Sequence, residues 1–282
     1  MKTIIRILIS AVLFVFFNGG DLLAQTNVLD GVYVKEHTPE RKVIPYTSLR
    51  EADVQWSKRI WRTIDLREKK NHPLYFPTEE INNRKSFIQV LLKGILSDGT
   101  ITAYDGFDDE FKKALTSSEV KVLLADKIDT INVEDPDNPG NFIQKQAITK
   151  FQPSSITKIG IKEDWFFDKQ RSVMDVRIVG LQAQQNATKE DGTVVLKPLF
   201  WVYFPEARYV FANAEVFNRK NDAERRTFED IFWKRDFASY ITKEANVYDR
   251  NIAEYKTGMD ALLESEDIKE QIFNYEHDMW EY

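Results

Sequence analysis

Residues 53–77 read DVQWSKRIWRTIDLREKKNHPLYFP, and this stretch sets the architecture that we expect for the chain. It holds two tryptophans, six basic and three acidic residues, in a chain of formal net charge −6. Apolar residues recur every four positions, at Ala52, Trp56, Ile60 and Ile64. That spacing is typical of one face of a helix. We therefore predict a helix over 52–70, which the Asn-His-Pro at 71–73 would end.

The remaining hydrophobic pattern predicts both helices and strands. The expected helices cover 84–96, a segment that begins at Thr116, 206–217 and 228–243. The expected strands cover 100–104, 173–180 and 194–204, with a polar hairpin loop at 184–192 between the last two. The stretch EDPDNPGN at 134–141 is a candidate loop or domain boundary. The predicted fold is α+β, with a helix-rich N-terminal part, a central antiparallel or mixed sheet and a helical C-terminal part.

The N-terminus has the features of a secretory signal peptide. Lys2 and Arg6 precede an apolar run at 7–17, and a cleavage site follows Ala24. The alternative, a membrane anchor, is disfavoured because the run is well short of the ~20 residues that span a bilayer. The chain has no cysteine, which excludes a lipoprotein anchor and disulfides. We expect an exported, periplasmic protein with no direct membrane span.

The acidity of the chain is concentrated in its tail. Residues 251–282 contain nine acidic residues and two lysines, a net charge of −7, so residues 25–250 are neutral overall. Ser265 has the sequence context of a helix N-cap, and apolar residues recur at helical spacing on both sides of it. We predict two acidic amphipathic helices, which either pack on their own domain or dock on a partner.

Catalytic and nucleotide-binding motifs are missing from the sequence. The three histidines, His37, His72 and His277, do not have metal-ligand spacing, so neither a metal nor another cofactor is expected. Two acidic groups, at 105–110 and 163–168, leave open a carboxylate-based hydrolase or a calcium site, although solvated turns explain them more simply. The aromatic residues leave open a carbohydrate-binding module. Export and negative charge argue against a nucleic-acid partner.

Five long stretches resemble a known family. They are WSKRIWRTIDLREKKNHPLYFP (56–77), ILSDGTITAYD (95–105), IKEDWFFDKQRSVMDVRIVGL (161–181), FWVYFPEARYVFANAEVFN (200–218) and FEDIFWKRDFASYITKEANVYDRNI (228–252). In this order they resemble the gliding-motility GldN family, called PorN in non-gliding relatives. The resemblance covers about Tyr46 to Ile252. It divides the chain into a signal peptide (1–24), a GldN-like domain (25–250) and an acidic helical tail (251–282).

The resemblance implies a function without catalysis. Members of the family are periplasmic components of the type IX secretion system of Bacteroidetes. They pair with an outer-membrane lipoprotein of the GldK/PorK kind, self-associate in a ring and meet the periplasmic part of the GldM/PorM motor protein.

A ring subunit needs partner-facing surfaces, and tryptophan, tyrosine and arginine dominate the energetics of such surfaces. The sequence offers nine candidate interface residues: Arg59, Trp61, Arg62, Arg67, Trp165, Arg171, Tyr248, Asp249 and Arg250. The basic segment near 58–70 and the acidic tail would suit contacts between two different faces of neighbouring subunits. Trp56, on the apolar face, is expected in the core.

Overall fold

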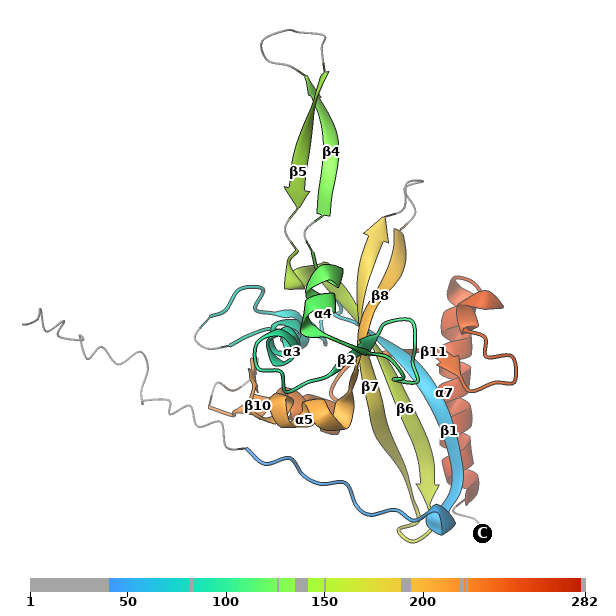
Figure 1. The fold of residues 1–282 in the computed structure, drawn as a ribbon. Coiled ribbons are helices and arrows are strands. Elements are labelled where there is room, and N and C mark those ends of the chain that lie inside the picture. Colours follow the sequence, from blue (N-terminus) through green and yellow to red (C-terminus); the bar gives the residue numbers. More distant parts are fainter. Residues whose placement is uncertain are drawn as a thin grey trace, which may run out of the picture. The chain divides into compact units, whose positions relative to one another are not determined.

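We describe a computed structural model of the chain, which covers residues 41–81, 84–125, 127–134, 142–149, 151–188, 194–218, 221 and 223–279. The predicted signal peptide at 1–24 and residues 135–141 of the candidate boundary lie outside these described residues. A seven-stranded antiparallel sheet forms the centre of the fold, with strand order β11-β1-β6-β7-β8-β2-β3 (Figure 1). The strands of this sheet are β1 (Val54–Asp65), β2 (Ala103–Asp105), β3 (Ala114–Leu115), β6 (Ile156–Asp168), β7 (Val173–Thr188), β8 (Val194–Tyr203) and β11 (Tyr240–Glu244). The predicted α+β class is confirmed, and the sheet is antiparallel.

Helices and two small sheets complete the chain. The helices are η1 (Glu51–Asp53), α2 (His72–Tyr75), α3 (Phe87–Leu96), α4 (Ser117–Leu123), η2 (Pro153–Ser155), α5 (Phe204–Ala212), α6 (Phe228–Trp233), η3 (Ile252–Glu254) and α7 (Met259–Met279). Strands β4 (Lys127–Glu134) and β5 (Phe142–Thr149) pair with each other, as do β9 (Glu215–Val216) and β10 (Arg226–Thr227). Two short helices begin with capping boxes, α3 at Ser86 and α4 at Thr116.

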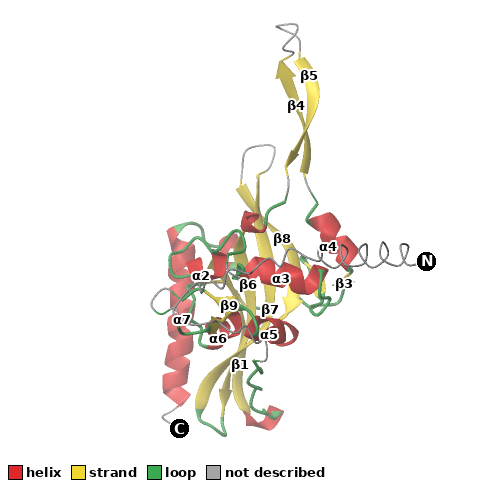
Figure 2. Cartoon of the chain, turned by 90° about the vertical axis from the view of Figure 1, so that its left-hand side faces the viewer, coloured by secondary structure: helices red, strands yellow, loops and turns green. Residues whose placement is uncertain are grey.

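The main core lies between the sheet and helices α3, α5 and α6 (Figure 2). Its centre is a group of phenylalanine rings in which Phe87 of α3 lies 4.9 Å from Phe211, 5.4 Å from Phe228 and 5.2 Å from Phe232, measured between ring centroids. All four side chains are fully buried. Aromatic rings bury large areas and favour tilted contacts at these separations, so this group fixes the helices against the sheet.

A second, smaller core attaches α7 to the edge of the sheet, where Figure 1 shows the helix beside β11 and β1. Ile60 and Ile241 of the strands meet Ile268 and Ile272 of the helix. Ser265 adds a hydrogen bond, because its Oγ accepts from the Ile241 backbone N–H at 2.7 Å. Ile60 and Ile64, four apart on β1, lie on one face of the sheet, and one joins each core.

The largest correction concerns the stretch that opened the sequence. Residues 54–65 form strand β1 and not part of a helix. A spacing of four residues also keeps side chains on one face of a strand, whose period is two. The intervening positions on that face are Lys58, which pairs with Glu244, and the buried Arg62. Because these two inward-facing residues are cations, the sequence does not show the alternation of apolar and polar residues that is typical of a strand. Trp56, expected in the core, is partly buried against the second core and stacks on Tyr275.

Four further predictions of local structure differ from what is observed. The helix expected over 228–243 ends at Trp233, and its second half is strand β11. The helix expected over 206–217 exists but ends at Ala212. The tail forms a short η3 and one long α7 instead of two amphipathic helices, and Ser265 lies inside α7 instead of capping it. Strand β7 continues to Thr188, into the expected loop.

Candidate functional site

Trp61 lies on the face of the sheet opposite to Ile60 and Ile64, because side chains alternate along a strand. Its neighbours in register are Lys162 of β6 and Lys243 of β11. The Lys243 Nζ lies 4.5 Å from the Trp61 ring centroid and the Lys162 Nζ lies 5.8 Å from it. Both ammonium groups are within cation–π range of the indole.

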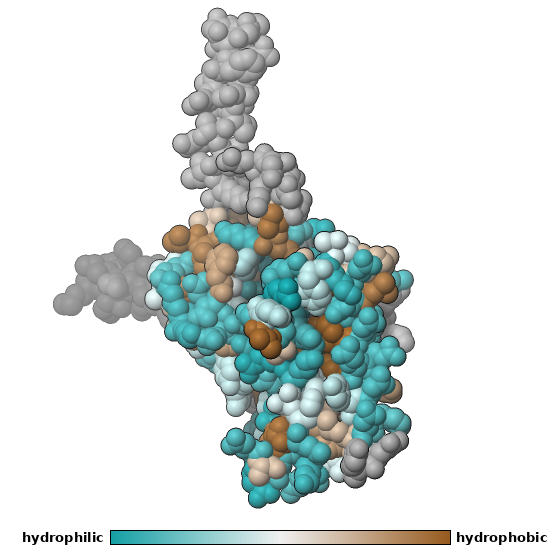
Figure 3. Space-filling view, turned by 90° about the vertical axis from the view of Figure 1, so that its right-hand side faces the viewer, coloured by the Kyte–Doolittle hydropathy of each residue, from teal (hydrophilic) through white to brown (hydrophobic). Residues whose placement is uncertain are grey.

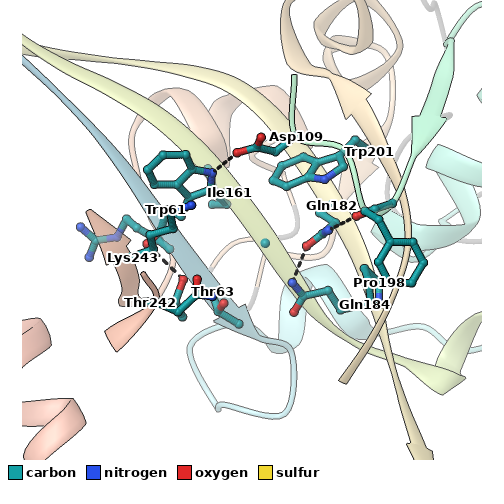
Figure 4. Close-up of a pocket in the computed structure, with 15 residues that line it drawn as sticks. Trp61, Thr63, Asp109, Ile161, Gln182, Gln184, Pro198, Trp201, Thr242 and Lys243 are labelled. Atoms are coloured by element: carbon teal, nitrogen blue, oxygen red, sulfur yellow. Dashed lines mark hydrogen bonds between the residues drawn. The ribbon is translucent and has the colours of Figure 1, made fainter. Parts of the chain in front are cut away.

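A loop from β2 supplies the third partner of Trp61. The indole Nε1 donates to Asp109 Oδ2 at 2.9 Å, and the buried Lys162 Nζ donates to the Asp109 carbonyl at 2.6 Å. The same loop is fixed where Gln182 Nε2 donates to the Gly106 carbonyl at 2.6 Å. A cavity of about 290 Å³ lies among these side chains (Figure 4). Trp61 is therefore held at the rim of a cavity by three loop and strand contacts.

Phe111 closes the far side of this loop. Its φ of 59° is unusual for a residue with a side chain, and such a conformation persists only where packing holds it. The ring makes edge contacts with Tyr104 at 5.3 Å and Trp201 at 5.9 Å between centroids. Gly180 makes room for it, because a Cβ there would lie 2.4 Å from the Phe111 ring.

Arg59 lies two residues before Trp61 and therefore on the same face. Its Nε donates to Asp164 Oδ1 at 2.6 Å and its Nη2 donates to Oδ2 at 2.9 Å. This bidentate pair raises the pKa of the Arg59 guanidinium above its ordinary value, against the effect of partial burial. Arg59 and Trp61 also line one wall of a second cavity of about 750 Å³.

The turn at 247–250 lies next to Trp61. Lys243 connects the two, since its Nζ is also 2.5 Å from Asp249 Oδ1. Asn246 builds the turn: its Oδ1 accepts from the backbone N–H groups of Tyr248 and Arg250, and its Nδ2 donates to two carbonyls. Tyr248 is 74% exposed, and the Arg250 guanidinium lies 4.4 Å from its ring centroid. A fixed turn therefore presents an aromatic and a cation to solvent.

The structure thus brings together five of the nine predicted residues. We call the Trp61 surface the set Arg59, Trp61, Asp109, Lys162, Lys243 and the turn at 247–250. Arg62 and Trp165 lie on the opposite face, where Trp165 Nε1 and Arg235 both donate to the fully buried Glu163. Burial lowers the pKa of Arg62.

The other two predicted residues lie elsewhere. Arg171 follows β6 and donates through Nε to Asp168 at 2.7 Å and through Nη2 to Asp175 at 3.0 Å. This contact holds the pKa of Asp168 below its ordinary value. Arg67 lines a separate groove beside α2.

Sequence reasoning did not assign Lys162, Lys243, Asp109 or Asn246 to the interface, although Asp109 belongs to the acidic group considered for catalysis. The first three meet Trp61 only through strand pairing and a loop contact, for which the local sequence has no signal. Asn246 does have one, because asparagine readily caps a turn two to four residues ahead.

Most carboxylates of the two acidic groups considered for catalysis lie beside cations, and Asp108 accepts backbone N–H groups. Glu163 is paired with Arg235, Asp164 with Arg59 and Asp168 with Arg171. Asp105 lies 3.8 Å from Lys113, and Glu110 pairs with Lys112. Of the tryptophans at the cavity, Trp201 is buried and Trp61 has ammonium groups over its ring. No observation here favours a hydrolase or a flat platform for a sugar.

Two further features are absent from the described residues. No group of three or more histidine, aspartate or glutamate side chains in them is placed to hold a metal ion. No helix in the same part of the chain is long and apolar enough to cross a membrane.

Comparison with known proteins identifies the family of the chain. A search of curated proteins finds no match. A family model described as gliding motility associated protein GldN matches residues 49–281, and therefore includes β1, the Trp61 surface and all of α7. That family is a component of the gliding and type IX secretion machinery and is not a known enzyme family. The chain belongs to the GldN family.

Proposed function

We propose that this chain is a non-enzymatic structural subunit of the type IX secretion machinery that works in the periplasm. The observation that carries the proposal is the family match over residues 49–281, which spans nearly all of the chain beyond the predicted signal peptide. The predicted signal peptide supports export. The lack of cysteine supports attachment to the outer membrane through a lipoprotein partner and not through a lipid on this chain.

Three contacts follow from the family resemblance. We propose a GldK/PorK-like lipoprotein as the membrane-side partner, a GldM/PorM-like periplasmic domain as the motor-side partner, and other copies of this chain as neighbours in a ring. A head-to-tail ring uses two different faces of each subunit. We keep the division into a GldN-like domain at 25–250 and an acidic helical tail at 251–282, with a possible sub-boundary near 134–141.

The Trp61 surface is our proposed site for one of the protein partners. It combines exposed Tyr248 and Arg250 with the half-buried Trp61, which are the residue types that carry most interface energy. Its backbone is fixed by Asn246 and its ion pairs are already formed, so little conformational entropy would be lost on binding. An ordered surface of this composition fits a protein partner better than a small ligand.

Affinity purification of the tagged protein from envelope membranes tests the proposal. A structural subunit should bring down a lipoprotein partner in stoichiometric amount, within a particle far larger than one 33.0 kDa chain. Recovery of the chain alone as a monomer, after mild solubilisation that preserves other envelope complexes, would contradict it.

A pair of tyrosine variants tests the Trp61 surface. Tyr248→Asp places a charge in the proposed interface and should reduce recovery of one partner by about 30-fold, as expected for an interface hot spot. Tyr209→Asp is the matched control, because Tyr209 on α5 is 67% exposed and lies outside this surface. Equal recovery with both variants would remove the Trp61 surface from the proposal.

A further inference from the structure

A groove beside α2 has an apolar floor and a basic rim. It has a volume of about 910 Å³ and is lined by Phe76, Ile81 and Phe217, which are 48%, 58% and 45% exposed. Arg67 and Lys69 stand at its rim, with Glu79 as the acidic residue among its lining. Exposed apolar clusters bordered by polar residues are typical of protein-binding sites.

The cations of this rim are available to a partner. Among the residues that the structure describes, Arg67, Lys69 and Arg84 have no carboxylate partner, although most other arginines of the fold do. Arg84 instead lies over the Phe217 ring at 5.5 Å from its centroid. The groove therefore has the charge and polarity to take an acidic amphipathic segment.

Helix α7 carries such a segment on its outward face. Its inward face, through Ser265, Ile268 and Ile272, is buried against the sheet. On the outward side Met259, Leu262 and Phe273 are 70%, 48% and 68% exposed. Figure 3 faces α7 and shows hydrophobic patches within a mostly hydrophilic surface.

The outward face of α7 is also acidic. The helix contains seven acidic residues and one lysine, a net charge of −6. Positions 259, 262, 266 and 273 recur at helical spacing, so Glu266 lies in the same stripe as the apolar residues. Recognition of an amphipathic helix in an apolar groove uses anchors at this spacing.

We propose that the outward stripe of α7 docks into the α2 groove of a second copy of this chain. The two surfaces are complementary. The helix stripe is apolar and acidic, with Glu266 paired, among the described residues, only with the exposed Lys269 of its own helix, and the groove is apolar and basic. The two faces are different, so the contact is heterologous and each added copy leaves one groove and one helix free. The proposal deepens the ring assembly proposed above and rests on it.

Two variants of the mature chain disrupt the groove and the helix stripe one at a time. The groove variant carries Arg67→Glu and Lys69→Glu, and the helix variant carries Leu262→Ser and Phe273→Ser; all four side chains are exposed, so folding should survive. Loss of either face should weaken self-association about 100-fold. Val122→Ser, at an exposed valine of α4, is the control and should associate like the original chain.

Mixing the two variants gives the decisive result. The helix of the groove variant and the groove of the helix variant are both intact, so the mixture should form a 1:1 dimer that grows no further. Sedimentation velocity and light scattering over a range of concentrations would detect it. Circular dichroism would show that each variant is folded.

Three outcomes overturn the inference: original chain that stays monomeric at every concentration, a helix variant that associates normally, or a mixture of folded variants with no dimer. Envelope purification separates this failure from failure of the proposed function. If the variants still recover the lipoprotein, the function stands whatever the self-contact does. If they lose the lipoprotein but still self-associate, the groove or helix binds that partner, and the self-docking inference is wrong.

Discussion

Removal of the Arg235 side chain should expose how much stability one buried ion pair supplies. Glu163 is 0% exposed, and Arg235 Nη2 donates to its two carboxylate oxygens at 2.9 and 3.0 Å. Trp165 Nε1 adds a third hydrogen bond at 2.9 Å. In Arg235→Ala the carboxylate would keep the indole but lose its cation, in a place that the protein has sealed from water.

The magnitude follows from the geometry. Breaking a buried pair from one side costs about 3–5 kcal/mol. The Arg235 side chain is 30% exposed, so water can enter where it stood, and the lower end, about 3 kcal/mol, is expected. Arg235 also has a φ of 54°, a left-handed conformation that costs a residue with a Cβ about 1 kcal/mol. Arg235→Gly should therefore cost about 2 kcal/mol, less than alanine.

Urea unfolding followed by tryptophan fluorescence measures these values, with Trp165 as a local probe beside Glu163. The matched background is Glu163→Gln, in which the buried group is neutral. Removing Arg235 there should cost about 1 kcal/mol or less, since no charge is left unpaired. The reasoning is refuted if Arg235→Ala costs the same in both backgrounds, or if glycine is no better tolerated than alanine.

Three further predictions test the cores and the acid response. Phe87→Ala should lower the free energy of unfolding by about 3–5 kcal/mol in urea titrations, because it leaves a void among three rings. Ser265→Ala removes the acceptor of the Ile241 N–H, so we expect a loss of about 1–3 kcal/mol and faster hydrogen exchange at that amide. Asp168, whose pKa is lowered by Arg171, stabilises the fold at neutral pH, and this contribution is lost as pH falls through the lowered pKa. Asp168→Asn should therefore destabilise the protein at pH 7, and its cost should shrink below about pH 4; a cost independent of pH would contradict the linkage.

Local signals predicted the parts of the fold that local interactions decide. Thr116 and Glu119 have capping-box spacing, and α4 begins there with both capping hydrogen bonds formed. The alternating residues of 173–180 belong to β7. By contrast, residues 54–65 satisfy helical and strand periods equally. Strand pairing with β6 along nearly the whole of β1 decided between them, and that partner lies about a hundred residues away in the sequence.

The candidate site shows the same division. Tryptophan and arginine type alone indicated Arg59 and Trp61, and β1 does place both on one exposed face. Arg62 has the same residue type, but it is buried beside Ser239, to which its Nε donates at 3.0 Å. One residue of register decides which side of a strand a side chain occupies. The prediction of a helix over 52–70 therefore could not tell which of these arginines is exposed and which is buried.

Arg235 shows why the end of α6 could not be predicted from the sequence. The Asp236 N–H donates to the Ile231 carbonyl and the Arg235 N–H to the Phe232 carbonyl, which is the hydrogen-bond pattern that ends a helix around a left-handed residue. Glycine usually occupies that position, and without it the apolar pattern predicted a helix that continued to 243. Glycine there would relieve about 1 kcal/mol of strain.

It would also give up the pair with Glu163, worth about 3 kcal/mol by the estimate above, so arginine is the more stable choice by about 2 kcal/mol. The pair between residues 72 positions apart thus explains why arginine, and not glycine, occupies the left-handed position that ends α6. Arg235→Gly tests this directly: the helix should still end at Trp233, because the backbone geometry is kept, while the stability of the pair is lost. A variant in which amide exchange shows α6 extending toward Tyr240 would mean that the side-chain pair, and not the left-handed backbone, ends the helix.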